Sequence, residues 1–214
     1  MNDLLIALGT ALTVATSTIS GTTTNNIGNR HLVVLGEQVL SLKTRYPDNS
    51  VNKAFAKNII NYLLTLSLLD PEGLKSDEDG YSFSIKLNPG DILAFHKEIL
   101  KEFTNRNVIS SPTELSPQEG YETLNGLSAN GVCHIASFIN QVASEANLVV
   151  TAKVNHDFAP VPDVPKKYGT SIYYMKGGGN NSKNQNLYIE NNYSAPVYLH
   201  FTISPETVKL TITQ

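Results

Sequence analysis

The chain has one cysteine and no tryptophan among its 214 residues. A single cysteine excludes an intrachain disulfide, and it also excludes a zinc site built from several cysteines. Charge is sparse as well: charged residues make up 16% of the sequence, and the formal net charge is −3. The largest basic cluster is the pair Lys166 and Lys167. We therefore expect no nucleic-acid partner, because such a partner requires a clustered basic surface.

No apolar run is long enough to cross a bilayer, so we expect no stable membrane span in the core. The one short run, LLIALGTALTV, covers residues 4–14. It fits the core of a signal peptide, although no basic residue precedes it, and it equally fits a buried N-terminal helix or strand. We treat residues 1–29 as a signal or flexible N-terminal segment. Few basic residues and many Asn, Ser and Thr are compatible with export to the cell envelope or the extracellular space.

The apolar content of the sequence, 41%, is typical of a globular protein. Residues 30–105 are predicted to form a helical lobe packed on the same core as the rest. Its strongest element is a helix that starts after Ser50 as N-cap and ends at Asp70, because apolar residues recur there every three or four positions. The region 31–42 fits a short helix or strand. Alternation predicts a strand over residues 81–87, and a second helix is expected over 92–103.

Residues 106–214 are predicted to form an α+β core. After a long loop to residue 131, a central helix carries Cys133 in its first turn, and Asn130 or Ser128 can cap it. Alternating residues predict a strand over 148–156 that ends on His156. Further strands are expected over 170–175, 186–190, 196–203 and 207–213, with a flexible polar hairpin loop over 176–186. The fold class we predict is therefore a Cys-bearing helix packed on an antiparallel sheet.

Four segments of this half occur in an order that resembles the VanW-like family. They are GVCHIASFINQVASEANLVV, HDFAPVPDVP, YGTSIYY and NLYIENNYSAPVYLHFTI, and the resemblance covers roughly residues 83–203. The chain departs from the family pattern at His134, where the family has glutamine. The family's glycine run is reduced to Asn130 and Gly131, and an acidic residue is replaced near 167–169.

The resemblance implies a bacterial cell-envelope protein. The family is named for an accessory protein of vancomycin-resistance clusters. Peptidoglycan or a cell-wall precursor is the partner that this implies. The oligomeric state does not follow from the sequence.

Cys133 and His156 are the candidate catalytic residues. Free N–H groups at a helix start stabilise a thiolate, and a histidine beside it can act as acid and base. A helix of about 15 residues runs roughly 22 Å, so an antiparallel strand of similar length would return His156 to the helix start. The alternative is that Cys133 is a buried core residue, and that His156 orients the proline-rich loop.

The other candidates are weaker. Asp157, Asp163 and Asn191 are candidates for a third catalytic group, and His134, Tyr168 and Tyr173 are candidate binding residues. We expect no metal ion and no cofactor. The glycines 177–179 lack the following Lys-Ser/Thr of a phosphate-binding loop.

Three functions remain open at this point. The first is an accessory domain that binds peptidoglycan or its precursors. The second is a cysteine peptidase, amidase or transpeptidase-like enzyme that uses a Cys133–His156 dyad. The third is a structural module in which the cysteine belongs to the core.

Overall fold

The computed structural model describes residues 32–214, which form one compact unit. The expectations for residues 1–29, including the apolar run 4–14, lie outside the described residues. A five-stranded sheet, antiparallel throughout, has the strand order β1-β11-β10-β3-β2. Its strands are β1 (Val34–Ser41), β2 (Lys75–Asp77), β3 (Gly80–Leu87), β10 (Val197–Ile203) and β11 (Thr207–Thr213).

A smaller, mixed sheet has the order β5-β4-β9-β8. It is built from β4 (Ile92–Ala94), β5 (Val108–Ser110), β8 (Val149–Thr151) and β9 (Tyr188–Glu190), and β4 and β5 are parallel. A short ribbon pairs β6 (Thr123–Leu124) with β7 (Leu127–Ser128). The α-helices are α1 (Asn49–Ser67), α2 (Val132–Glu145) and α3 (Gly179–Asn184), and 3-10 turns cover Pro71–Gly73, Lys101–Phe103, Pro117–Glu119 and Lys166–Tyr168. The predicted α+β class is confirmed.

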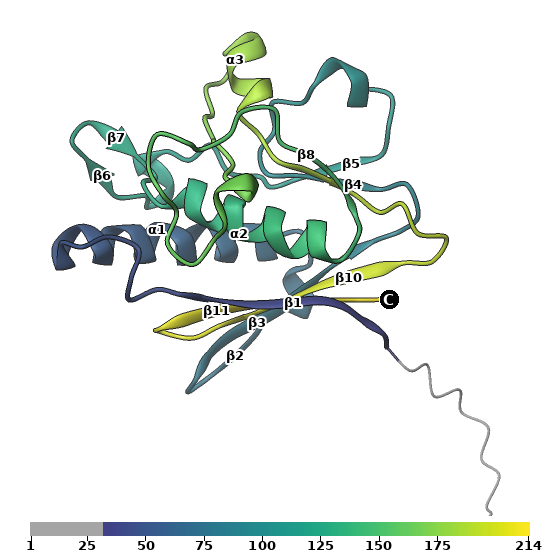
Figure 1. The fold of residues 1–214 in the computed structure, drawn as a ribbon, viewed down its shortest axis with the longest axis horizontal. Helices are drawn as coiled ribbons and strands as arrows, with labels where there is room; N and C mark the ends of the chain where they lie inside the picture. The colour runs from purple at the N-terminus through teal and green to yellow at the C-terminus, as the bar shows by residue number, and fades with distance from the viewer. Residues whose placement is uncertain (1–31) are drawn as a thin grey trace, which may run out of the picture. The chain divides into compact units, whose positions relative to one another are not determined.

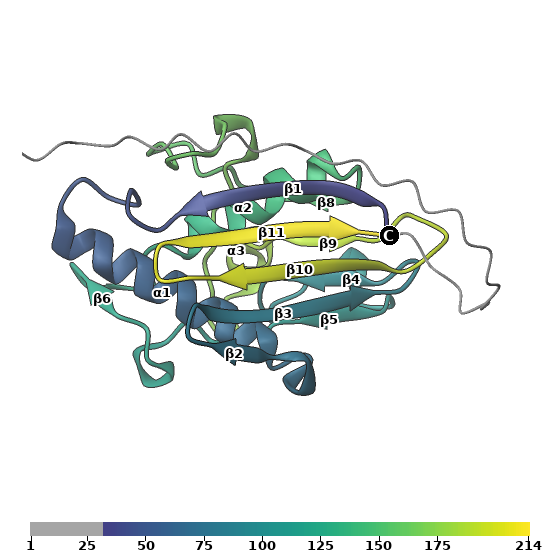
Figure 2. The same ribbon diagram turned by 90° about the horizontal axis from the view of Figure 1, so that it is seen from below.

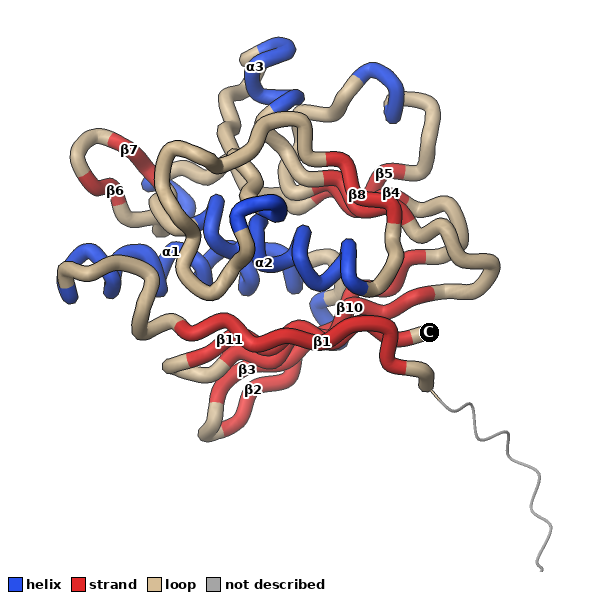
Figure 3. Tube along the Cα trace, viewed as in Figure 1, coloured by secondary structure: helices blue, strands red, loops and turns tan. Residues whose placement is uncertain are grey.

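The helices α1 and α2 lie against one face of the five-stranded sheet (Figure 1). The four-stranded sheet lies on the far side of α2, so that the blue helices separate two groups of red strands in Figure 3. Within residues 32–214, no α-helix lies on the opposite face of the five-stranded sheet (Figure 2). None of the helices in the described part is long and apolar enough to cross a membrane.

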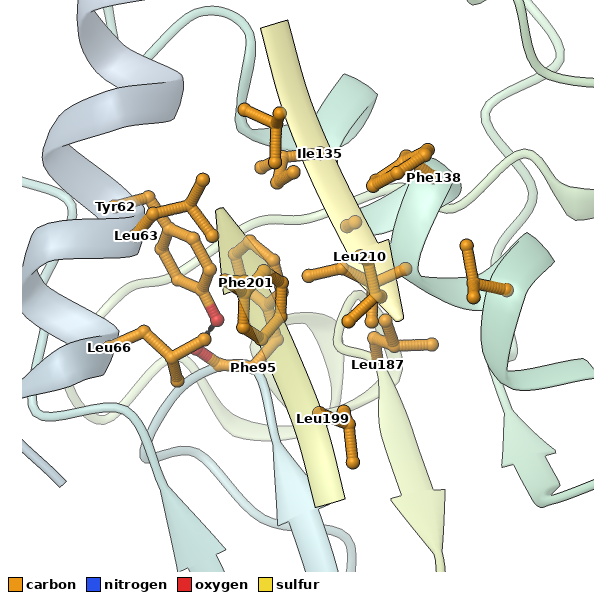
Figure 4. Packing of buried hydrophobic residues seen from close by; sticks show 14 of the residues in the cluster. Tyr62, Leu63, Leu66, Phe95, Ile135, Phe138, Leu187, Leu199, Phe201 and Leu210 are labelled. Atoms are coloured by element: carbon orange, nitrogen blue, oxygen red, sulfur yellow. Dashed lines mark hydrogen bonds between the residues drawn. The ribbon is translucent and has the colours of Figure 1, made fainter. Parts of the chain in front are cut away.

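The main core fills the space between α1, α2 and the large sheet (Figure 4). Tyr62 of α1, Phe138 of α2 and Phe201 of β10 are almost completely buried there. The ring of Tyr62 stacks on Phe95 with centroids 3.8 Å apart, and its hydroxyl donates to the Phe95 carbonyl at 3.2 Å. The hydroxyl is therefore satisfied inside an apolar layer, where a lone polar group would be costly.

The two long helices begin differently from what the sequence predicts. Asp48, and not Ser50, is the N-cap of α1, because its carboxylate accepts from the backbone N–H groups of Ser50 and Val51. Helix α2 has Gly131 at its N-cap, without a side-chain cap from Asn130 or Ser128. Gly131 has φ of 102°, and a Cβ there would lie 2.7 Å from the carbonyl oxygen of Phe55 in α1. Glycine thus lets the start of α2 approach the backbone of α1.

The predicted helix over 92–103 is wrong. Residues 92–94 form β4, an interior strand whose side chains are buried on both faces, and only Lys101–Phe103 form a 3-10 turn. A strand buried on both faces is a continuous apolar run, which periodicity cannot separate from a buried helix. The ambiguous region 31–42 contains strand β1, and the strand predicted over 81–87 is confirmed as β3.

Three predictions around the site also need correction. The strand predicted over 148–156 ends at Thr151, so His156 lies in a loop beyond β8. Residues 170–175 form no strand, because side chains of other elements take up part of their backbone hydrogen bonding. The segment 176–186 contains the short helix α3. The strands expected near 186–190, 196–203 and 207–213 are confirmed as β9, β10 and β11.

The boundary predicted near residue 105 stays a prediction about domain organisation. Strands from both sides of it share the large sheet: β1 pairs with β11, and β3 pairs with β10. Helix α1 contacts α2 directly.

Replacing Gly131 with alanine should destabilise the protein by about 2 kcal/mol or more, because a positive φ and a backbone clash add together. Gly126 is the matched control, since its φ is 79° and a Cβ there would meet nothing within 4 Å. Its alanine variant should lose only about 1 kcal/mol, the cost of the strained φ. Urea unfolding of both variants measures the difference. Equal losses would contradict a close approach of α2 to α1.

Candidate functional site

One face of α2 carries a polar stripe, which we define as Cys133, Ser137 and Asn140. The stripe binds the backbone of segment 168–172. Ser137 Oγ accepts from the Thr170 N–H at 2.8 Å, and the Asn140 amide donates to the Tyr168 carbonyl at 3.0 Å. The spacing of four and three residues places all three side chains on the same side of a helix. This stripe lets an irregular segment lie on α2 without strand partners.

Cys133 is the first member of this stripe. Its Sγ accepts from the Ile172 N–H at 3.3 Å and lies 3.7 Å from the Ile172 carbonyl oxygen, to which the thiol donates. Burial raises the pKa of the Cys133 thiol to about 11, although the Ile172 N–H acts in the opposite direction. Desolvation therefore outweighs the helix start, and the thiol is protonated at neutral pH.

His156 lies next to His134. Their rings are 6.0 Å apart between centroids and nearly perpendicular, at 89°. Among the hydrogen bonds of residues 32–214, none joins Cys133 to His156. The contact found at the start of α2 is thus a pair of histidines.

The ring of His156 is fixed by its own loop. Its Nδ1 lies 3.1 Å from the Ala159 carbonyl, which can only accept, so Nδ1 carries the proton. Burial lowers the pKa of His156, and this hydrogen bond opposes the shift. Phe158 packs on the same ring with centroids 4.1 Å apart, yet 80% of Phe158 is exposed. A buried imidazole, neutral at pH 7, therefore supports an exposed aromatic ring.

His134 is held in an apolar setting. It is only 6% exposed, and Phe55 of α1 packs edge-on against its ring at 5.1 Å. Within the described residues, its Nδ1 has no hydrogen-bond partner. Burial lowers its pKa to about 3, and the nearby charge of Arg45 acts in the same direction. His134 is therefore neutral over the physiological pH range.

Arg45 lies in the segment between β1 and α1. It binds the proline-rich loop, which we define as residues 157–169. The residue is 1% exposed. Its guanidinium donates to the Pro162 carbonyl at 2.9 Å and forms an ion pair with Asp163. Burial lowers the pKa of Arg45, and Asp163 opposes that shift. Because a buried guanidinium without its partner is costly, this contact fixes where the loop lies.

The loop and His156 enclose a pocket of about 210 Å³. Its apolar walls include Pro160, Val161 and Val164. Asp157 and Lys166 add one charge of each sign. A small apolar pocket with a few polar groups is the usual form of a ligand site.

The remaining predicted residues are spread over different surroundings. Asp157 lines the pocket, and Asp163 pairs with Arg45. The fully buried Asn191 uses its amide on the Leu87 and Ala195 carbonyls and so supports the β9–β10 connection. Tyr168 carries the ammonium of Lys167 over its ring at 4.6 Å, and the Tyr173 hydroxyl contacts the Met175 sulfur at 3.8 Å. None of the three proposed third groups forms a hydrogen bond with His156 within the described chain.

In residues 32–214, no three His, Cys, Asp or Glu side chains come together in a way that could hold a metal ion. The groups that meet at the site are two neutral histidines, a buried guanidinium and an aromatic ring. Of these groups, the Phe158 ring is the exposed one, at 80%.

The sequence reasoning missed Arg45, Phe158 and the polar stripe. The stripe had a usable signal, since Cys133, Ser137, Asn140 and Ser144 recur at helical spacing. Phe158 stands between an Asp and an Ala in a proline-rich loop, where an apolar ring has little chance of burial. Arg45 lies far from the loop in the chain and had no such signal.

Comparison with family models identifies the class. The model described as "VanW like protein" matches residues 84–213, which is more than half of the chain. The chain therefore belongs to the VanW-like family, as the resemblance implied. The family is linked to vancomycin resistance and to the cell envelope. Neither the curated proteins nor the solved structures gave a match.

The raised pKa predicts slow alkylation of Cys133 in the folded protein. With a pKa of about 11 in place of about 8.5, the thiolate fraction at pH 8 is about 200-fold smaller. Iodoacetamide labelling followed by mass spectrometry should therefore be on the order of 100-fold slower in the native than in the urea-unfolded chain. A native rate equal to or above the unfolded rate would contradict the desolvated thiol and favour an activated nucleophile.

The lowered pKa of His134 predicts a loss of stability in acid. In the unfolded chain His134 takes up a proton near pH 6.5, whereas in the folded chain it does so only near 3. Its contribution is thus complete above pH 6.5 and falls by about 1.4 kcal/mol for each pH unit as the pH drops toward 3. The variant His134→Phe lacks this pH-dependent contribution to the free energy of unfolding.

Unfolding free energies of both proteins at pH 7, 6 and 5 measure it. The wild type should lose more stability than the variant, by about 2 kcal/mol at most over this range. Parallel curves would show that His134 does not titrate with a lowered pKa.

Proposed function

We propose that this protein is a binding domain of the bacterial cell envelope that holds peptidoglycan or its precursors in the pocket of the proline-rich loop. The observation that carries this proposal is the exposed ring of Phe158. The ring packs on His156, and His156 lines the pocket. Aromatic residues are enriched in binding surfaces, where their rings supply contact area.

The chemistry of the pocket suits a cell-wall fragment. Peptidoglycan consists of sugars with short peptide stems, and the stems carry free carboxylates and amines. Lys166 can pair with a carboxylate, and Asp157 can pair with an ammonium group. The apolar walls suit alanine side chains of a stem, and Phe158 can stack on the face of a sugar ring.

The alternative function is a cysteine enzyme with Cys133 as nucleophile and His156 as base. It stays a prediction. Two observations favour binding over the enzyme. The pKa of the Cys133 thiol is raised, and its sulfur accepts a hydrogen bond from the Ile172 N–H. An enzyme of this kind needs a thiolate that is free to attack.

Sedimentation of the protein with purified peptidoglycan tests the proposal. The wild type should bind, and Phe158→Ser should bind about tenfold more weakly, because an aromatic contact of this size is lost. Leu127→Ser is the matched control, since Leu127 of β7 is also exposed, at 67%, and lies on another element. It should bind like the wild type.

Two results would contradict the proposal. The first is a wild type that does not sediment with peptidoglycan, or a Phe158→Ser variant that binds as well as it does. The second is release of soluble fragments by the wild type that Cys133→Ala abolishes, which would establish the enzyme in place of the binding domain.

A further inference from the structure

A second concave surface lies away from the pocket, between α1 and the turn that joins β10 to β11. It encloses about 460 Å³ and is broad and open to solvent. Figures 1 and 2 both place this turn beside α1. The surface is built mainly from residues 42–60, which precede the family match at 84–213. Its residues on α1 therefore lie outside the family match, whereas Pro205 and Glu206 lie inside it, and nothing in it depends on the function proposed above.

Its floor is apolar. Leu42, Ala56, Ile60 and Pro205 form it. Ala56 and Ile60 are four residues apart on α1, so they form one row along the helix. The small side chain of Ala56 leaves room for another backbone to approach this row. We call the whole surface the lysine groove.

Its rim is basic. Lys53 and Lys57 form a second row on α1, next to the apolar row, and Lys43 lies across the groove. Lys43 pairs with Glu206 at 2.6 Å and Lys57 pairs with Glu122 at 2.7 Å, both at exposed positions.

Lys53 has no acidic partner within the described part of the chain. The surface thus carries three lysines against one glutamate, and Lys53 supplies the positive charge that no acidic group of residues 32–214 balances.

We propose that the lysine groove binds an acidic, amphipathic helical segment of another protein. A row of Ala56 and Ile60 beside a row of Lys53 and Lys57 complements a helix that carries leucines in one row and glutamates in the next. The charges steer the partner, and the apolar row stabilises the complex. A free polyanion would gain nothing from the apolar floor, whereas an amphipathic helix uses both rows.

The test uses a synthetic helical peptide of about 15 residues with leucine and glutamate rows four residues apart. Fluorescence anisotropy with the full chain should show binding that weakens as salt is raised from 50 to 300 mM, values chosen to shorten the screening length. The same peptide with Gln for Glu should bind about tenfold more weakly. Polyglutamate and phosphatidylglycerol vesicles should show no binding of comparable strength.

Two variants probe the two rows. Lys53→Glu reverses the unpaired charge and should weaken peptide binding about tenfold, and Ile60→Ser should weaken it by a similar factor. Lys75→Glu, at an exposed position on β2, is the matched control and should leave binding unchanged. The proposal is overturned if the Gln peptide binds as well as the Glu peptide, if Lys53→Glu binds normally, or if vesicles or polyglutamate are preferred.

Discussion

Helix α2 lies between two sheets, and this position constrains everything near the site. Eleven of its 14 residues are buried, so almost every face of the helix has a packing partner. The apolar side packs on β1 and β11, and the polar stripe holds segment 168–172. Cys133 belongs to the polar stripe. A thiol that satisfies a buried backbone N–H is part of the packing, and the desolvation that raises its pKa follows directly from that position.

The position of the proline-rich loop depends on one buried guanidinium. Arg45 comes from the segment before α1, yet it holds Pro162 and Asp163 of the proline-rich loop. The loop has little regular structure of its own, so contacts of this kind determine its course. With the loop fixed, His156 lines the pocket and the tilted ring of Phe158 packs on it. The Arg45 contact thus fixes the loop on the core around α2, and the loop in turn positions the exposed ring of Phe158.

Local patterns predicted much of the fold, and long-range contacts account for the failures. The periodicities of α1, α2, β3 and β11 were sufficient, because each buries one regular face. Strand β4 is buried on both faces, which removed the pattern that distinguishes strand from helix. At the site, the sequence identified His134 and His156 but paired His156 with Cys133, since it assumed a strand that continues to His156. That strand ends at Thr151, and Arg45, 117 residues before Pro162, had no local signal at all.

The central claim is that the proline-rich loop and its pocket bind cell-wall fragments. Titration of the ¹⁵N-labelled protein with a purified disaccharide-peptide fragment of peptidoglycan tests it most directly, because NMR shift changes locate the contact residue by residue. The account predicts saturable changes confined to residues 154–169 and their neighbours in α2, with the amides of β10 and β11 unaffected. Changes centred on another surface, or none at millimolar fragment, would contradict it.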